Sequence, residues 1–134
     1  MKSKKIILNA IIVFLCLIFV IVSGVFISQM VDYNRSYHPD ESSFLYACQE
    51  QDYVRMVNMM HRNLAAGVKS SDTMEECYAV AEYYEAATYY RAYFIAGNHD
   101  KAMKKKQIMD EKAALMGDLF YVAEDINKKL ELDL

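Results

Sequence analysis

The feature that most constrains this chain is a run of 23 uncharged residues near the N-terminus, Ile6 to Ser28. Seventeen of the 23 are Ile, Leu, Val or Phe, so a helix made of them has no polar face. At about 1.5 Å per residue such a helix reaches about 35 Å, which is enough to cross a bilayer core of about 30 Å. Because a core helix of a soluble protein is rarely so long and so apolar on every side, the run predicts one transmembrane helix over residues 6–28.

The charges that flank the apolar run predict its orientation. Lys2, Lys4 and Lys5 precede the run, whereas only Arg35 lies close behind it. Cytoplasmic flanks of membrane helices carry an excess of Lys and Arg. We therefore expect a single-pass protein of the cell membrane, with residues 1–5 cytoplasmic, a short linker over residues 29–39 and an extracytoplasmic domain over residues 40–134.

A cleaved signal peptide is the alternative interpretation of the same run. The small residues of Val22-Ser23-Gly24 offer a conceivable cleavage point, and cleavage would release a secreted helical protein. The run is longer than the roughly 7–15 apolar residues usual in such peptides, which favours an anchor that is retained.

The rest of the chain, roughly 100 residues, has the size of one compact domain. One Pro and four Gly in the whole chain leave few residues for the turns of a sheet, while Ala, Met, Glu and Lys favour helices. We therefore predict an all-α fold, with the transmembrane helix followed by a small antiparallel helical bundle or a short solenoid of helical hairpins. From Asp32 onward 12 Lys and Arg face 18 Asp and Glu, a net charge of −6 that argues against nucleic acid as a partner.

Turn signals divide the domain into helical segments. Pro39 and the acids behind it indicate a helix start, and helical character continues to about Ala66 with a possible break at residues 50–52. Gly67 ends that segment, and Thr73 with Glu76 is spaced as the capping box of a helix that runs to Ala96. After Gly97-Asn98, one last helix is predicted from His99 to about Leu130.

The helix over residues 73–96 differs from the others because apolar and aromatic residues occupy two of its sides. Such a helix should contact two neighbours, which places it centrally in the domain. The two rows are Cys77, Val80, Tyr84, Ala87 and Ile95 on one side, and Tyr78, Ala81, Tyr89, Ala92 and Ala96 on the other.

Two turns resemble those of tetratricopeptide-repeat hairpins: Gln51-Asp52-Tyr53 with Arg55-Met56, and Ala96-Gly97-Asn98 with Asp100-Lys101-Ala102. The resemblance covers residues 41–131 and at most two repeat units. Aligned on the second turn, Tyr93 and Ala102 match the repeat pattern, whereas the Trp, Leu and Gly of the first repeat helix and the terminal Pro are replaced. The resemblance implies a helical protein-interaction module rather than an enzyme.

Tyrosine is the unusual signal among the residues that carry chemistry. A tyrosine ring packs while its hydroxyl reaches a polar partner, a combination used in cores and at interfaces. The helix predicted over residues 73–96 is rich in tyrosine, and the plain interpretation is that these side chains belong to the core and its rim. The sharper hypothesis is a contact surface for another protein or for a small ligand or envelope polymer, formed by Tyr83, Tyr84, Tyr89, Tyr90 and Tyr93.

The cysteines, acids and lysines carry weaker hypotheses. If Cys48 and Cys77 lie on one long hairpin they are about 20 Å apart, which opposes a disulfide between them. Buried free thiols are the leading interpretation, and an interchain link or a reactive thiol is the alternative. Glu82 and Glu85 are the only paired acids that invite a hydrolase hypothesis, and Lys104-Lys105-Lys106 is typical of a solvated face. We predict no catalytic residues, no metal site and no cofactor.

These patterns favour a non-enzymatic, membrane-anchored interaction or structural subunit of the cell envelope. We expect the membrane, contacted by Ile6 to Ser28, and another protein as its partners. A small-ligand or envelope-polymer binding module that uses the tyrosine helix is the alternative function.

Overall fold

The computed structural model describes the backbone of residues 2–37 and 39–134, and the side chains of residues 5–30 and 39–134. In these residues the chain contains α-helices and one 3-10 turn but no strand, which confirms the predicted all-α class. Residues 1–37 and 38–134 form two compact units.

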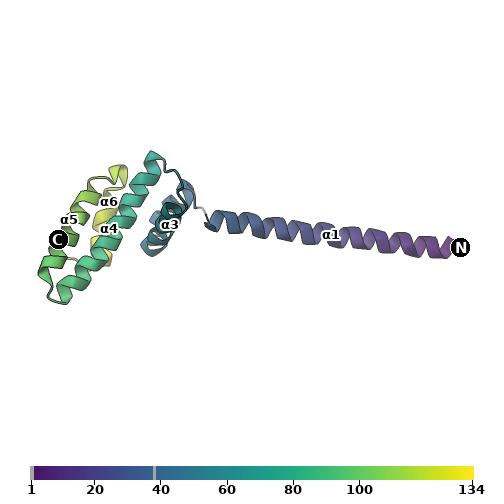
Figure 1. Cartoon of the computed structure of the whole chain (residues 1–134), viewed down its shortest axis with the longest axis horizontal. Helices are drawn as coiled ribbons and strands as arrows, with labels where there is room; N and C mark the ends of the chain where they lie inside the picture. The colour runs from purple at the N-terminus through teal and green to yellow at the C-terminus, as the bar shows by residue number, and fades with distance from the viewer. Residues whose placement is uncertain (1, 38) are drawn as a thin grey trace. The chain divides into compact units, whose positions relative to one another are not determined.

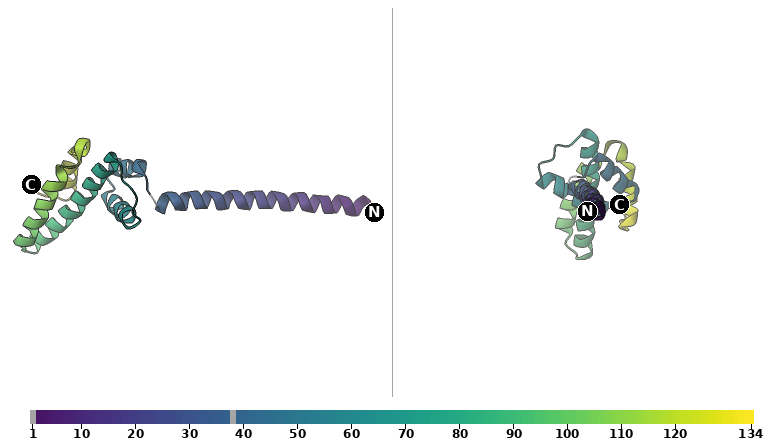
Figure 2. Two further views of the ribbon diagram at one scale, coloured as in Figure 1. Left: turned by 45° about the horizontal axis from the view of Figure 1, so that its top comes forward. Right: turned by 90° about the vertical axis from the view of Figure 1, so that its right-hand side faces the viewer.

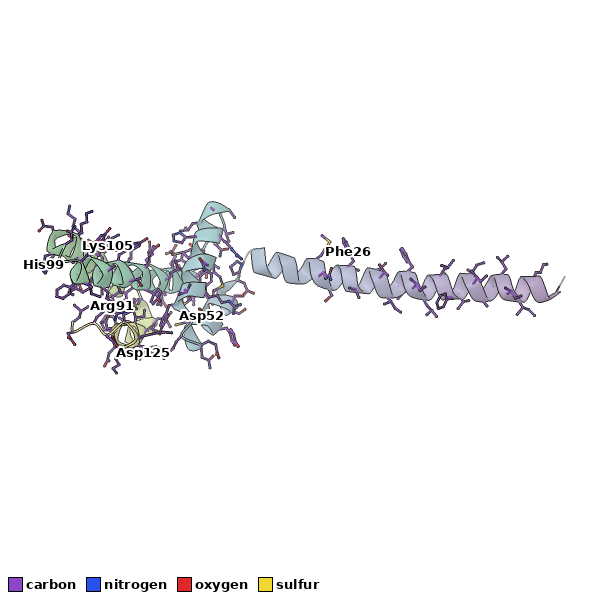
Figure 3. All side chains as sticks on the ribbon, turned by 90° about the horizontal axis from the view of Figure 1, so that it is seen from below. Phe26, Asp52, Arg91, His99, Lys105 and Asp125 are labelled. Carbon is purple, nitrogen blue, oxygen red and sulfur yellow. The ribbon has the colours of Figure 1, made fainter. Side chains whose placement is uncertain are left out.

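The first unit is one helix, α1 (Lys2–Tyr37). Its segment Lys5–Met30 is long and apolar enough to cross a membrane, and no part of that apolar stretch is buried against protein. The side chains project outward around the axis, as at Phe26 (Figure 3). The helix continues to Tyr37, so α1 includes most of residues 29–39, the segment predicted as a linker.

Helices α2 (Glu41–Gln49) and α3 (Tyr53–Ala65) form the first hairpin of the domain, which confirms the break at residues 50–52. Asp40 caps α2, and the hydrogen bonds that its carboxylate accepts from Ser43 and Ser42 lower its pKa below 3.8. In the turn, Gln51 adopts a positive φ of 54°. The chain then reverses because Asp52 caps the next helix at the backbone N–H of Arg55.

The left-handed conformation of Gln51 predicts that Gln51→Gly stabilises the domain by about 0.5–1 kcal/mol. The gain is the relief of about 1–2 kcal/mol of left-handed strain, less the entropy that a glycine adds to the unfolded chain. Urea unfolding of both proteins measures the difference. Glu50→Gly is the matched control, because Glu50 has an ordinary φ of −76° and its replacement should destabilise the domain.

Helix α4 (Asp72–Ile95) is the longest of the domain and ends where predicted. Its N-cap, however, is Ser71, whose Oγ accepts a hydrogen bond from the backbone N–H of Met74. The predicted capping box at Thr73 and Glu76 is therefore wrong, because the helix begins before Thr73 and both residues lie inside it.

The central position predicted for this helix is confirmed. Helix α4 packs against α3 on one side and against α5 (His99–Ala113) on the other (Figure 1). Gly97 has a φ of 72°, and the side chain of Asn98 caps α5 at Lys101, so α4 and α5 form a tight antiparallel hairpin.

The single last helix predicted to Leu130 is wrong. Helix α5 stops at Ala113, a 3-10 turn η1 (Gly117–Leu119) follows, and α6 (Tyr121–Lys129) then lies against α4 (Figure 2). Gly117 has a φ of 55°, a conformation that a continuing helix cannot contain. Buried Val122 and Ile126 hold α6 in place, together with a hydrogen bond of 2.9 Å from the Tyr83 hydroxyl to Asn127.

Cys48 and Cys77 lie in the shared core of the domain as free thiols. The separation of about 20 Å inferred from a long hairpin is wrong, because α2 folds back at residue 51 and packs against α4. Burial, with a further contribution from the charge of Cys48, raises the pKa of Cys77 to about 12. Burial also raises the pKa of Cys48.

We expect both buried thiols to resist alkylation at pH 8 in the folded chain, at least about 100-fold relative to the chain in urea, because thiolate must form to react. Folding raises the Cys77 pKa from 9.0 to about 12, so this contribution to stability is complete below pH 9 and is lost as the pH rises towards 12. Iodoacetamide labelling followed by peptide mass spectrometry measures the protection. Lys69→Cys, at an exposed position, is the reactive control, and rapid labelling of Cys77 in the folded chain would contradict the prediction.

Candidate interaction surface

The structure divides the five tyrosines proposed as a surface into two groups. Tyr83 is buried, and burial raises its pKa. Tyr84 is half-buried against α3, where its ring centroid lies 5.4 Å from that of Tyr53. These two belong to the packing of the domain, whereas Tyr89, Tyr90 and Tyr93 occupy the last two turns of α4, beside the start of α5.

Tyr89 and Tyr93 form the first of two aromatic stacks at this end. Their ring centroids are 6.4 Å apart with an interplanar angle of 25°. Lys105 Nζ lies 5.0 Å from the Tyr89 centroid, and Lys101 Nζ lies 5.5 Å from the Tyr93 centroid. We call these four residues the aromatic–lysine seam, since α4 contributes both rings and α5 both ammonium groups.

The seam follows from the antiparallel register of the two helices. Moving four residues back along α4 corresponds to moving four residues forward along α5, so Tyr93 faces Lys101 and Tyr89 faces Lys105. Further along the same register Glu82 meets Lys112, with 2.6 Å between Oε2 and Nζ. In the two pairs nearest the turn, a tyrosine ring takes the place that a carboxylate has in the Glu82–Lys112 pair. Such cation–π contacts contribute about 0.5–1 kcal/mol at exposed sites.

The second stack lies on another side of α4 and is more apolar. The Tyr90 and Phe94 centroids are 5.8 Å apart, and the His99 ring meets Phe94 edge-on at 5.6 Å. Phe94 is 54% exposed and Ile95 is 73% exposed. Arg91, His99 and Lys105 are all found toward this end of the domain (Figure 3).

Sequence reasoning found the tyrosines but missed their neighbours in this surface. The α4–α5 turn brings Lys101 and Lys105 to the tyrosines of the seam and brings His99 to Phe94 in the second stack. The signal that locates these neighbours is the register set by Gly97-Asn98. The lysines of the run Lys104-Lys105-Lys106 have different partners: Lys105 contacts the Tyr89 ring, whereas Lys106 pairs with Asp110 at 2.8 Å.

Two hollows in the surface lie beside tyrosines of α4. One of about 180 Å³ lies between α3 and α4 beside Tyr84 and Tyr89. A larger one, about 530 Å³, is lined by Tyr83, Lys106, Asp110, Phe120 and Asn127 among others. The hydroxyl of Tyr83 already donates to Asn127, so its polar group is committed within the protein.

The paired acids have separate partners. Glu82 binds Lys112, whereas Glu85 Oε1 lies 3.3 Å from His61 Nε2. Both carboxylates are partly exposed on the surface of α4, and each is positioned for a salt bridge rather than for shared acid and base roles. Across the described residues, no three His, Cys, Asp or Glu side chains gather as they would around a metal ion.

The α2–α3 turn and the α4–α5 turn have the same backbone geometry. Gln51 and Gly97 have positive φ angles of 54° and 72°. Asp52 and Asn98 follow them, and each side chain accepts a hydrogen bond from the backbone N–H three residues later. The α2–α3 and α4–α5 hairpins are therefore closed in the same way.

No protein-family model, curated protein or solved structure matches this chain.

Proposed function

We propose that this chain is a single-pass membrane protein whose helical domain is a non-enzymatic protein-interaction or structural subunit of the cell envelope. The observation that carries the proposal is the exposed group of aromatic and aliphatic side chains at the end of the α4–α5 hairpin. Phe94 and Ile95 contribute apolar surface there, and the aromatic–lysine seam contributes rings with fixed positive charges. Aromatic side chains of this kind are enriched where proteins bind one another.

The anchor in this proposal is α1, whose span Lys5–Met30 has the length and composition to cross a bilayer. The lysines at positions 2, 4 and 5 support a cytoplasmic N-terminus, which puts the domain outside the cytoplasm. An introduced Lys69→Cys tests this orientation, because position 69 is exposed. A membrane-impermeant thiol reagent should label it in intact cells, and labelling only after membrane disruption would reverse the orientation.

The tetratricopeptide-like character of the domain is part of the proposal. Two hairpins with the same turn geometry support it, since repeated hairpins of that kind build interaction surfaces. Under this proposal the domain positions its partner by surface contact and performs no chemistry on it.

In-cell photocrosslinking tests the binding surface. A photoreactive amino acid at Ile95 should capture a discrete protein, because Ile95 is 73% exposed, more than the other large hydrophobic residues of the hairpin end. The same amino acid at Leu115 is the matched control, since Leu115 is 60% exposed but follows the far end of α5. Equal products from both positions, or none from Ile95, would contradict the proposal.

The hollow beside Tyr83 favours binding of a small ligand or an envelope polymer as the second candidate function. Its volume of about 530 Å³ and its lining by Lys106, Asp110 and Phe120 suit a molecule with both polar and apolar parts. Ala113→Trp would fill the hollow without altering the hairpin end. Loss of biological activity in this variant, with crosslinking at Ile95 unchanged, would favour the second candidate over the first.

A further inference from the structure

The two lysines of the aromatic–lysine seam have unused hydrogen-bonding capacity. An ammonium group carries three donors, and a tyrosine ring face attracts the charge without accepting all of them. In the described part of the chain neither Lys101 nor Lys105 pairs with a carboxylate, although Lys106 and Lys112 on the same helix do. The seam therefore presents two aligned positive charges to solvent.

The register of the hairpin shows how a carboxylate fits this row. At the Glu82 position the carboxylate itself reaches Lys112, at 2.6 Å. Two turns closer to the hairpin end, and again at the following turn, a tyrosine ring faces the lysine in place of a carboxylate. Lys101 and Lys105 are one helical turn apart, about 6 Å along the axis, which is also the spacing of acids at positions i and i+4 of another helix.

We infer that the aromatic–lysine seam binds an acidic helix of a partner protein, whose carboxylates at i and i+4 meet Lys101 and Lys105. The inference rests on the proposed function and adds the chemistry of the partner. Local charge complementarity supports it, because the seam presents two ammonium groups on a domain that otherwise carries a net negative charge and repels acids. At the seam, the two ammonium groups attract the carboxylates that the rest of the domain repels.

The neighbourhood of the seam favours a protein helix over a phosphate polymer or a lipid headgroup. Lysine is a point charge and lacks the fork with which arginine holds phosphate at two points. Within the seam the Tyr89 side chain is 47% exposed, and a strongly hydrated polyanion gains nothing from the apolar face of its ring. An amphipathic acidic helix uses both the charges and the apolar surface.

The test uses the full chain in uncharged detergent micelles and two fluorescent helical peptides of identical composition. One peptide carries Glu at i and i+4, and the other carries the same residues at i and i+2. We expect the first to bind measurably tighter in fluorescence anisotropy, with an affinity that falls as salt is added. Lys101→Glu with Lys105→Glu should weaken it about tenfold or more, since two ion pairs become two repulsions.

Two matched variants make the result specific. Lys69→Glu with Lys104→Glu changes the net charge equally but leaves the seam intact, and should change the affinity by less than about threefold. A peptide with Lys in place of Glu should bind the reversed seam and restore affinity. If the reversed variant fails to fold by circular dichroism, Lys101→Gln with Lys105→Gln replaces it and should still weaken binding.

Several outcomes would overturn the inference. These are absence of binding at millimolar peptide, equal binding of the i, i+2 peptide, and equal weakening by the control variant. Seam-dependent binding of polyphosphate or of vesicles with anionic lipid, without peptide binding, would also overturn it in favour of a phosphate ligand. A protein crosslinked at Ile95 without peptide binding would leave the proposed function standing and remove only this inference.

Discussion

Asn63→Asp is expected to destabilise the domain by about 3–5 kcal/mol, the cost typical of an uncompensated buried charge. Asn63 is fully buried, and its Nδ2 donates a hydrogen bond of 2.9 Å to the carbonyl of Pro39. The substitution removes that donor and directs a carboxylate at a carbonyl oxygen. Urea unfolding of the full chain in detergent, followed by circular dichroism, measures the loss.

The pH dependence of this variant identifies the cause. Burial raises the folded-state pKa of the new carboxyl above its unfolded value near 4, so the variant is least impaired below about pH 4 and loses stability as the pH rises. Asn58→Asp is the control, because Asn58 is exposed on the same helix and its replacement should change stability by less than about 0.5 kcal/mol. Equal effects of the two substitutions would show that the buried hydrogen bond is unimportant.

Phe44→Ala is expected to cost about 3–5 kcal/mol of the free energy of unfolding. The side chain is fully buried, and its ring meets that of Tyr78 edge-on at 5.3 Å and 64°. Truncation removes this aromatic contact and leaves a cavity between α2 and α4. Because a domain of this size has a total stability of about 5–15 kcal/mol, the variant should unfold at a markedly lower temperature.

Tyr46→Ala is the control for the Phe44 prediction. Tyr46 is on the same helix but is 54% exposed, so its loss should shift the unfolding midpoint little. A Phe44→Ala variant as stable as the Tyr46→Ala variant would mean that α2 is not part of the cooperative core.

The apolar run and the helix ends before Gly67 and Gly97 were predictable from the sequence because each depends on local chemistry. A single long apolar segment satisfies its own backbone hydrogen bonds in a bilayer only as a helix, and Gly67 and Gly97 end helices through the positive φ that they adopt. The two-sided apolar pattern of residues 73–96 correctly predicted a helix between two others. These features require no knowledge of distant contacts.

The break between α5 and α6 was missed because the apolar pattern continues across it. Met109, Met116 and Ile126 are all buried, so their spacing suggests a single helix. The backbone reverses at Gly117, and α6 buries its apolar side against α4 after the turn. Gly117 was the residue that could have indicated a break, but the apolar spacing across it was given more weight.

The candidate surface was predictable only in part because it depends on how two helices are aligned. Tyr89 and Tyr93 stand out in the sequence, but their lysine partners are known only once the turn at Gly97 sets the register. The same limit explains the error at Cys48, whose distance from Cys77 depends on the reversal of the chain at Gln51.

The tie between Asn63 and Pro39 has a mechanical consequence for a chain anchored at its N-terminus. Tension that passes along the backbone out of α1 reaches Pro39 first, and there it is transferred to α3 through the Asn63 side chain. Glu41 passes part of it on to α4, because its carboxylate accepts a hydrogen bond of 2.8 Å from the Ser71 hydroxyl. A pull on α1 would thus be shared by α2, α3 and α4 through these two hydrogen bonds.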